Sequence, residues 1–200
     1  SHDDLRKQPS LKNGKNSIKT KDETIDTDRM VKFKIFSAVF MYPDEKFFEI
    51  FPELIPQKEE MRREYDHLFR AKEIWLYGAE YTLKTEFQRA NLLSDIMGFY
   101  RSFGLDTDKD RPDSLSSELE FMYYLIFKKW HALRSKHIKD AEKKALVCID
   151  AQKKFFVQHL YPAAKSITER VIKESKNDFY IEKAKELLTF MESEKKFLGV

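Results

Sequence analysis

Apolar side chains recur every three or four positions along the stretch that begins near residue 114. The recurring residues are Leu115, Leu119, Met122, Ile126, Trp130 and Leu133. This spacing predicts an amphipathic helix that buries one stripe. Three further apolar residues, Phe121, Tyr124 and Leu125, widen the surface beyond a single stripe. We therefore expect this helix either to lie between neighbouring helices or to leave part of its surface for a partner.

The segment before this helix is an acidic loop. A preceding helix is predicted to end at Phe103, because Gly104 suits the left-handed residue that follows a helix. Pro112 prevents a continuous helix, and either Asp113 or Ser114 can cap the helix that follows. The acidic residues of this loop are Asp106, Asp108, Asp110 and Asp113. The helix then carries Glu118 and Glu120 in its first two turns, where the helix dipole favours negative charge.

The rest of the chain is also predicted to be helical. Expected helices cover about 28–41, a short stretch after Asp44, 57–70, 83–103, 139–160, a stretch that starts at Pro162 and ends near 177, and 178–197. The connection 71–81 is rich in large apolar side chains and is expected to pack onto the protein. Residues 1–28 are polar and predict a flexible tail, partly a cloning remnant, and 29–200 form one domain. We expect an all-α fold, a single-domain helical bundle.

Composition supports this fold and narrows the function. The 200 residues fit one domain, and few Gly and Pro with many Lys and Glu favour helices. The 37 basic and 34 acidic side chains are thoroughly mixed, so the net charge of +3 does not indicate nucleic-acid binding. We find no apolar run of membrane-spanning length and no signal peptide, and we expect a cytoplasmic protein.

The motifs of common enzymes and metal sites do not occur in the chain. The aspartates at 106–110 resemble a calcium loop, but Arg111 and Ser117 stand where that loop needs Gly and Glu. No nucleotide-binding glycine loop or zinc spacing is found. Glu118 and Glu120 are two apart on a helix and face different directions, which disfavours an acid–base pair. Cys148 is expected to be a buried apolar residue. We therefore predict no metal and no catalytic activity.

Several segments resemble the TorD/DmsD/NarJ family of cytoplasmic chaperones for molybdenum enzymes. The three most specific are FYRSFGL at 99–105, PDSL at 112–115 and ELEFM at 118–122. EYDHLF at 64–69 and HLYP at 159–162 add to the resemblance. It covers roughly residues 29–198 and implies a TorD-like helical fold.

Two places differ from the family pattern. Ser114 stands where the family usually has His after the Asp, and the family's proline-rich aromatic segment appears only as WLYGAEY at 75–81. In the family both places are associated with recognition of the client's leader peptide. The client or its mode of binding is therefore expected to differ from those of the best-known members.

The resemblance implies a system-specific chaperone that binds the leader peptide or apoprotein of a molybdopterin-containing oxidoreductase before export. The leader is often a twin-arginine signal peptide, whose arginines would pair with carboxylates while its apolar run lies in a groove. The alternative is a permanent assembly subunit of a reductase complex. The residues expected to bind the client or leader are Tyr77, Tyr81, Tyr100, Asp110, Asp113, Ser114, Glu118 and Phe121.

The resemblance also sets the expected partners and cofactors. The partner is the apo form of the catalytic subunit, and the chaperone is a monomer or a homodimer without nucleic-acid or membrane contacts. No resident cofactor is expected. Transient contact with molybdopterin or a guanine nucleotide follows from the resemblance alone, because no residue in the chain indicates it.

Overall fold

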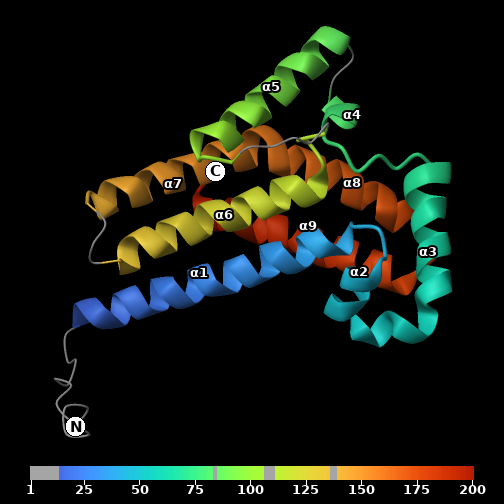
Figure 1. Ribbon diagram of the computed structural model, residues 1–200, viewed down its shortest axis with the longest axis horizontal. Helices are drawn as coiled ribbons and strands as arrows, with labels where there is room; N and C mark the ends of the chain where they lie inside the picture. Colours follow the sequence, from blue (N-terminus) through green and yellow to red (C-terminus); the bar gives the residue numbers. More distant parts are fainter. Residues whose placement is uncertain (1–13, 83–84, 106–110, 136–138) are drawn as a thin grey trace, which may run out of the picture.

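The computed structural model describes residues 14–82, 85–105, 111–135 and 139–200. The α-helices are α1 (Gly14–Val39), α2 (Glu45–Ile50), α3 (Lys58–Asp66), α4 (Ala79–Thr82), α5 (Glu86–Ser102), α6 (Leu115–Arg134), α7 (Ala141–Phe155), α8 (Tyr161–Glu174) and α9 (Asp178–Leu198). A 3₁₀ segment, η1 (Pro52–Gln57), precedes α3, and π-helical turns η2 (His67–Ala71) and η3 (Phe156–Leu160) follow α3 and α7. In the described residues the only extended pairing is one isolated bridge. The predicted all-α fold is confirmed (Figure 1).

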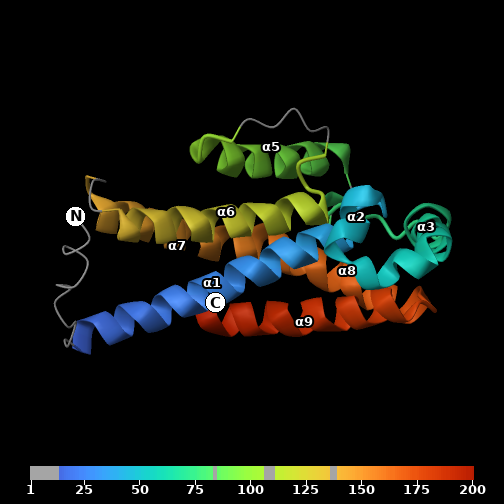
Figure 2. The same cartoon turned by 60° about the horizontal axis from the view of Figure 1, so that its bottom comes forward.

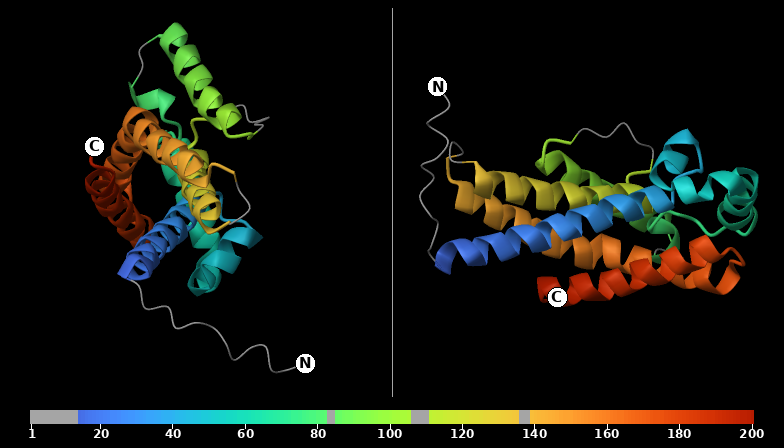
Figure 3. Two further views of the ribbon diagram at one scale, coloured as in Figure 1. Left: turned by 90° about the vertical axis from the view of Figure 1, so that its left-hand side faces the viewer. Right: turned by 90° about the horizontal axis from the view of Figure 1, so that it is seen from below.

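Helix α6 lies at the centre of the bundle. It packs against α1 on one side and α7 on the other, while α8 packs against α9. Seen end-on, α1, α6, α7, α8 and α9 surround a common axis, and α5 lies outside them (Figure 3). The α6 side chains Phe121 and Leu125 are buried, so the alternative in which α6 is sandwiched between helices is correct for this surface. The predicted stripe is buried as far as Ile126, whereas Leu133 is exposed.

Local sequence signals place the helix ends. The Asp44 carboxylate accepts a hydrogen bond from the Phe47 amide at 3.0 Å and caps α2, as predicted. Of the two candidate caps of α6, Ser114 has the role, since its Oγ accepts from the Ser117 amide at 3.2 Å. Gly104 has φ +76° after the end of α5, the left-handed conformation expected there.

The predicted start of the first helix is wrong. Helix α1 begins at Gly14 and runs through Asp28 without a break, so it crosses the expected boundary between tail and domain. The physical reason lies in Asp26 and Arg29, which are buried in ion pairs with other helices and hold this part of the chain on the bundle. The remainder of the expected tail, residues 1–13, lies outside the described residues.

Helices α7 and α8 follow one another through the π-helical turn η3 rather than through a loop. Pro162 lies in the first turn of α8, as predicted. The turn places His159 on the inner side of the bundle, 6% exposed. π-Helical turns of this kind are frequent at functional sites.

Helix α5 is the outlying element. Figure 2 shows it along one side of the molecule, with α6 and α7 between it and α9. It attaches through Ile96 and Tyr100, which are buried, while Phe87 at its first turn is 76% exposed. Across the described ranges, no helix combines the length and apolar character required to cross a lipid bilayer.

Candidate functional site

The connection after α3 pairs with the start of α6. The Gly78 amide donates to the Asp113 carbonyl at 3.0 Å, and the Leu115 amide donates to the Leu76 carbonyl at 2.9 Å. The Asp113 side chain adds a third link, accepting from the Ala79 amide at 2.9 Å. We call this region, residues 76–80 with 111–118, the junction. It holds two segments more than thirty residues apart in fixed register.

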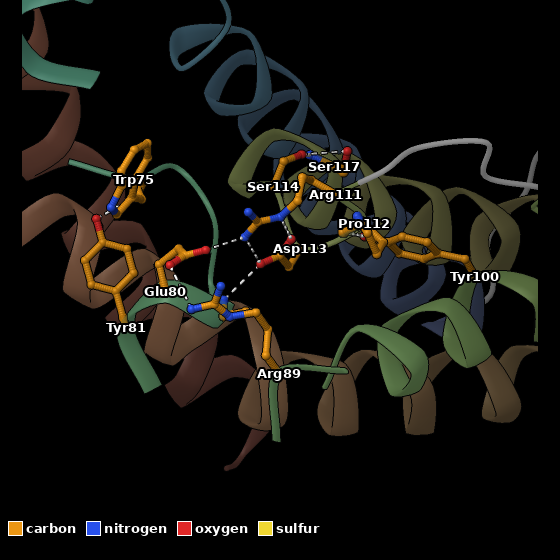
Figure 4. A network of polar contacts seen from close by, with 11 residues as sticks. Trp75, Glu80, Tyr81, Arg89, Tyr100, Arg111, Pro112, Asp113, Ser114 and Ser117 are labelled. Carbon is orange, nitrogen blue, oxygen red and sulfur yellow. Dashed lines mark hydrogen bonds and ion pairs between the residues drawn. The ribbon is translucent and has the colours of Figure 1, made fainter. Parts of the chain in front are cut away.

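At the junction a guanidinium group is enclosed by two carboxylates and an aromatic ring. Arg111 donates to both carboxylate oxygens of Asp113, Nε to Oδ1 and Nη2 to Oδ2, each at 3.0 Å. Its Nη2 also donates to Glu80 at 3.1 Å (Figure 4), and its guanidinium carbon lies 4.0 Å from the centre of the Tyr77 ring. We call Tyr77, Glu80 and Asp113 the arginine cage.

Electrostatics and exposure distinguish the two sides of the arginine cage. Hydrogen bonding to Asp113 raises the pKa of Arg111 above its usual value. Asp113 is fully buried, whereas the side chains of Glu80 and Arg111 are 17% and 31% exposed. Arg89 from α5 pairs with the second oxygen of Glu80 at 3.2 Å. The cage is therefore closed on the side of Asp113 and partly open to solvent on the side of Glu80.

Beside the cage lies a buried carboxyl group without a partner. Glu118 is 1% exposed, and neither of its carboxyl oxygens has a hydrogen-bond partner. Burial raises its pKa well above the usual value, and the nearby Asp113 charge acts in the same direction. Such an arrangement is costly, because an unpaired buried polar group is destabilising. Glu118 is thus a candidate for a group that gains a partner from outside the chain.

Glu118 faces a small cavity between α5, α6 and the start of α8. The cavity has a volume of about 20 Å³, the scale of a single water molecule. Its lining residues are Gly78, Leu92, Ile96, Glu118, Gln158, His159, Pro162 and Ala163. Gly78 is needed here: a Cβ atom at that position would lie 3.1 Å from the Ala163 Cβ and 3.3 Å from a Glu118 oxygen.

His159, which also lines the cavity, pairs with a carboxylate on α5. His159 Nε2 lies 2.5 Å from Oδ2 of Asp95, which is on α5 and half exposed. Burial lowers the pKa of His159, and the Asp95 interaction only partly opposes this effect. The neutral imidazole is therefore favoured. The contact also fastens α5 to η3 across the cavity.

The predicted binding residues divide into two groups. Tyr77, Asp113, Ser114 and Glu118 meet at the junction. Tyr100 and Phe121 lie in the core, each 2% exposed, with ring centres 4.8 Å apart. The Tyr100 hydroxyl donates to the Pro112 carbonyl at 2.7 Å and so supports the junction from within. These two residues are positioned to shape the site.

The remaining two predicted binding residues, Tyr81 and Asp110, belong to neither group. Tyr81 is half-buried on α4, where its hydroxyl donates to the Trp75 carbonyl at 2.6 Å. Asp110 lies outside the described residues. Asp113 and Glu118 are buried rather than presented on the surface, because the connection before α4 and helix α5 cover the first turn of α6. A direct role in client binding stays a prediction for all of these residues.

Sequence reasoning missed Gly78, Glu80, Arg111 and His159 as partners of this site. Charge alternation near Arg111 was visible, but its pairing with Glu80, 31 residues away, was not. Among the residues that the structure describes, no three His, Cys, Asp or Glu side chains group as metal ligands. Cys148 is buried, and burial raises the pKa of its thiol.

Comparison with protein families identifies the family of the chain. No curated protein was found to match the chain. The family model described as nitrate reductase delta subunit matches residues 53–168. The match includes the junction, the arginine cage and the cavity beneath α5. With more than half of its length matched, the chain belongs to the nitrate reductase delta subunit family, the NarJ/TorD-like chaperones.

Proposed function

We propose that this protein is a maturation chaperone that binds the leader peptide or apoprotein of a molybdopterin-containing oxidoreductase. It would hold the catalytic subunit during cofactor insertion and assembly, before export, and act from the cytoplasm. The observation that carries the proposal is the family match over residues 53–168, which spans the whole junction. The chaperone would bind and release its client without chemical turnover.

The chemistry of the junction supports recognition of arginine. A twin-arginine leader offers two guanidinium groups followed by an apolar run. The junction offers the carboxyl groups of Glu80, Asp113 and Glu118, and arginine forms strong, often bidentate hydrogen bonds with carboxylates. Glu80, whose side chain is 17% exposed, is the carboxyl group of the junction that an incoming arginine would meet first.

Isothermal titration with leader peptides tests the proposal. The purified chain is titrated with leaders from the molybdoenzymes of its own source, each paired with a variant in which both arginines are lysine. Lysine keeps the charge but loses the planar donor geometry. Micromolar or tighter binding that weakens at least about fivefold with the lysine variant would support the proposal. Equal binding of both peptides, or binding of neither, would contradict leader recognition.

A permanent assembly subunit is the second candidate. It is favoured by exposed apolar side chains far from the junction, among them Leu146 and Val157, which are 66% and 52% exposed. A lasting interface would cover such residues. Purification from the native source distinguishes the candidates: constant stoichiometric association with mature, cofactor-loaded enzyme supports the subunit, and association with the apoenzyme alone supports the chaperone.

A further inference from the structure

We infer that the arginine cage is a receptor for an arginine side chain of the client and that Arg111 occupies it as an internal substitute in the free protein. The inference rests on the proposed function for the identity of the client. The cage itself is defined by Tyr77, Glu80 and Asp113, which together form the contacts by which proteins select arginine over lysine.

The contacts of Arg111 show which ligand the cage accepts. The two hydrogen bonds of 3.0 Å to Asp113 are parallel and bidentate, a geometry that a guanidinium satisfies and an ammonium does not. The Tyr77 ring lies 4.0 Å from the guanidinium carbon, which is cation–π distance. Glu80 provides a third hydrogen bond on the exposed side. The occupant of this cage has to be a planar cation.

The position of Arg111 makes it replaceable. It lies two residues before Asp113, so its bidentate pair is local, and its further hydrogen bond to Glu80 is the contact that reaches a distant segment. Its side chain is 31% exposed, whereas the Asp113 carboxylate that it covers is fully buried. A second arginine can therefore approach from solvent on the side of Glu80. Release of Arg111 would place its own charge in water, where it is well solvated.

The unpartnered carboxyl group of Glu118 provides an independent observation at the junction. Three carboxyl groups, those of Glu80, Asp113 and Glu118, lie with two arginines, Arg89 and Arg111. Glu118 is more than nine-tenths buried, and its carboxyl oxygens have no hydrogen-bond partner. One of these oxygens lies near Gly78, since a Cβ atom added there would be 3.3 Å from it. The Gly78 amide in turn donates to the Asp113 carbonyl. Burial raises the pKa of Glu118 well above its usual value and so favours its neutral form, which leaves Glu80 and Asp113 balanced by Arg89 and Arg111. Glu118 is therefore an unused hydrogen-bonding group beside the cage rather than an uncompensated charge.

Removal of Arg111 should empty the cage and improve binding of an external arginine. An internal occupant reduces the fraction of protein that is ready to bind, and apparent affinity falls by the same fraction. If Arg111 fills the cage roughly nine-tenths of the time or more, its loss should strengthen binding about tenfold or more. The variants are Arg111→Ala and, as a second test with a longer neutral side chain, Arg111→Gln.

Arg89→Ala is the matched control. Within the described residues, Arg89 pairs with the same Glu80 at 3.2 Å and contacts neither Asp113 nor Tyr77. The control therefore removes one arginine from the junction and leaves the cage filled. Its affinity for arginine ligands should stay within about twofold of the unaltered protein, because the cage keeps its occupant.

The first experiment uses N-acetyl-arginine amide, which needs no leader peptide. Thermal unfolding is recorded with increasing ligand for the unaltered protein and the three variants, with N-acetyl-lysine amide in parallel. We expect a saturable rise in unfolding temperature for Arg111→Ala and Arg111→Gln with the arginine compound only. No saturable rise in either variant, or an equal rise in the unaltered protein, would overturn the inference.

The second experiment repeats the leader titration with the same proteins. Binding of the arginine leader should be about tenfold tighter to Arg111→Ala, and the gain should disappear with the lysine leader. An affinity that is unchanged or weaker in Arg111→Ala would overturn the inference while leaving leader recognition intact. If arginine amide binds the variant but no leader binds any protein, leader recognition fails and the cage is supported as a site for another arginine-bearing client.

Discussion

Two buried ionic clusters of this protein differ in whether their charges are paired. The first, which we call the Arg29 cluster, joins Asp26, Arg29, Lys129, Gln152 and Glu194 from α1, α6, α7 and α9. The second is the junction. In the Arg29 cluster two positive and two negative side chains balance, and Arg29 reaches Glu194 through Nε at 2.9 Å. At the junction the Glu118 carboxyl is left without a partner.

The difference is between a cluster whose charges are paired and one that leaves a buried carboxyl group without a partner. A buried charge is tolerated when hydrogen bonds and an opposite charge surround it, and a complete network specifies one arrangement of helices. The Arg29 cluster meets this condition at each of its charged groups and holds α1 against α9. The junction does not meet it at Glu118, whose buried carboxyl group has no hydrogen-bond partner. The three changes below test this contrast, from the largest expected effect to the smallest.

Removal of Arg29 should cause the largest loss of stability. Arg29→Ala leaves two carboxylates buried, Asp26 with Lys129 as its remaining partner and Glu194 without its arginine, and this kind of loss costs about 3–5 kcal/mol. Denaturant unfolding measures the change. Lys154→Ala is the control, since its pair with Asp150 is well exposed and is worth at most about 1 kcal/mol. Equal effects of the two variants would show that the Arg29 cluster contributes no more than a surface pair.

Neutralisation of Glu118 should increase the stability of the protein rather than reduce it. The folded pKa of Glu118 is raised above 4.5, so the folded state binds more protons than the unfolded state above that pH, and stability falls as pH rises. Glu118→Gln should therefore be more stable than the unaltered protein at pH 8 by about 1–3 kcal/mol, and the gain should vanish below pH 4.5. Unfolding measured at both pH values checks this.

Glu120→Gln is the control for that change. Glu120 is half exposed and pairs with Lys34 at 3.2 Å on the surface, so its removal should change stability by less than about 1 kcal/mol. A loss of stability in Glu118→Gln at pH 8 would mean that the Glu118 carboxylate has hydrogen-bond partners in solution. The two clusters would then not differ in the pairing of their charges.

Enlargement of Gly78 should have the smallest effect. Gly78→Ala places a Cβ 3.1 Å from the Ala163 Cβ and 3.3 Å from a Glu118 oxygen, and the crowding should cost about 1 kcal/mol. Gly98→Ala is the matched control, because its Cβ would meet nothing within 4 Å and alanine favours the interior of α5 by up to about 1 kcal/mol. Thermal unfolding should therefore shift in opposite directions for the two variants. A shift in the same direction would show that the connection can move away from α6.

The sequence alone determined most of the local structure. The apolar spacing from Leu115 to Ile126 predicted α6, and Asp44, Gly104 and the pair Asp113–Ser114 predicted helix ends within one residue. These features follow from interactions between residues close in the chain, whose geometry is the same in any helix. The residues of the junction were also found in large part, because the family motifs at 112–115 and 118–122 contain them.

Only the tertiary structure decided how those residues are paired. Glu80 and Arg111 lie 31 residues apart, and Arg29 and Glu194 lie 165 apart, so no local pattern could show that they meet. A distant partner also explains the wrong start of α1: residues 14–28 are too polar to predict burial, yet Asp26 is buried because Lys129 of α6 pairs with it beside its neighbour Arg29. Local chemistry determines where helices begin and end, whereas the energy of a buried charge depends on neighbours that only the packed bundle brings together.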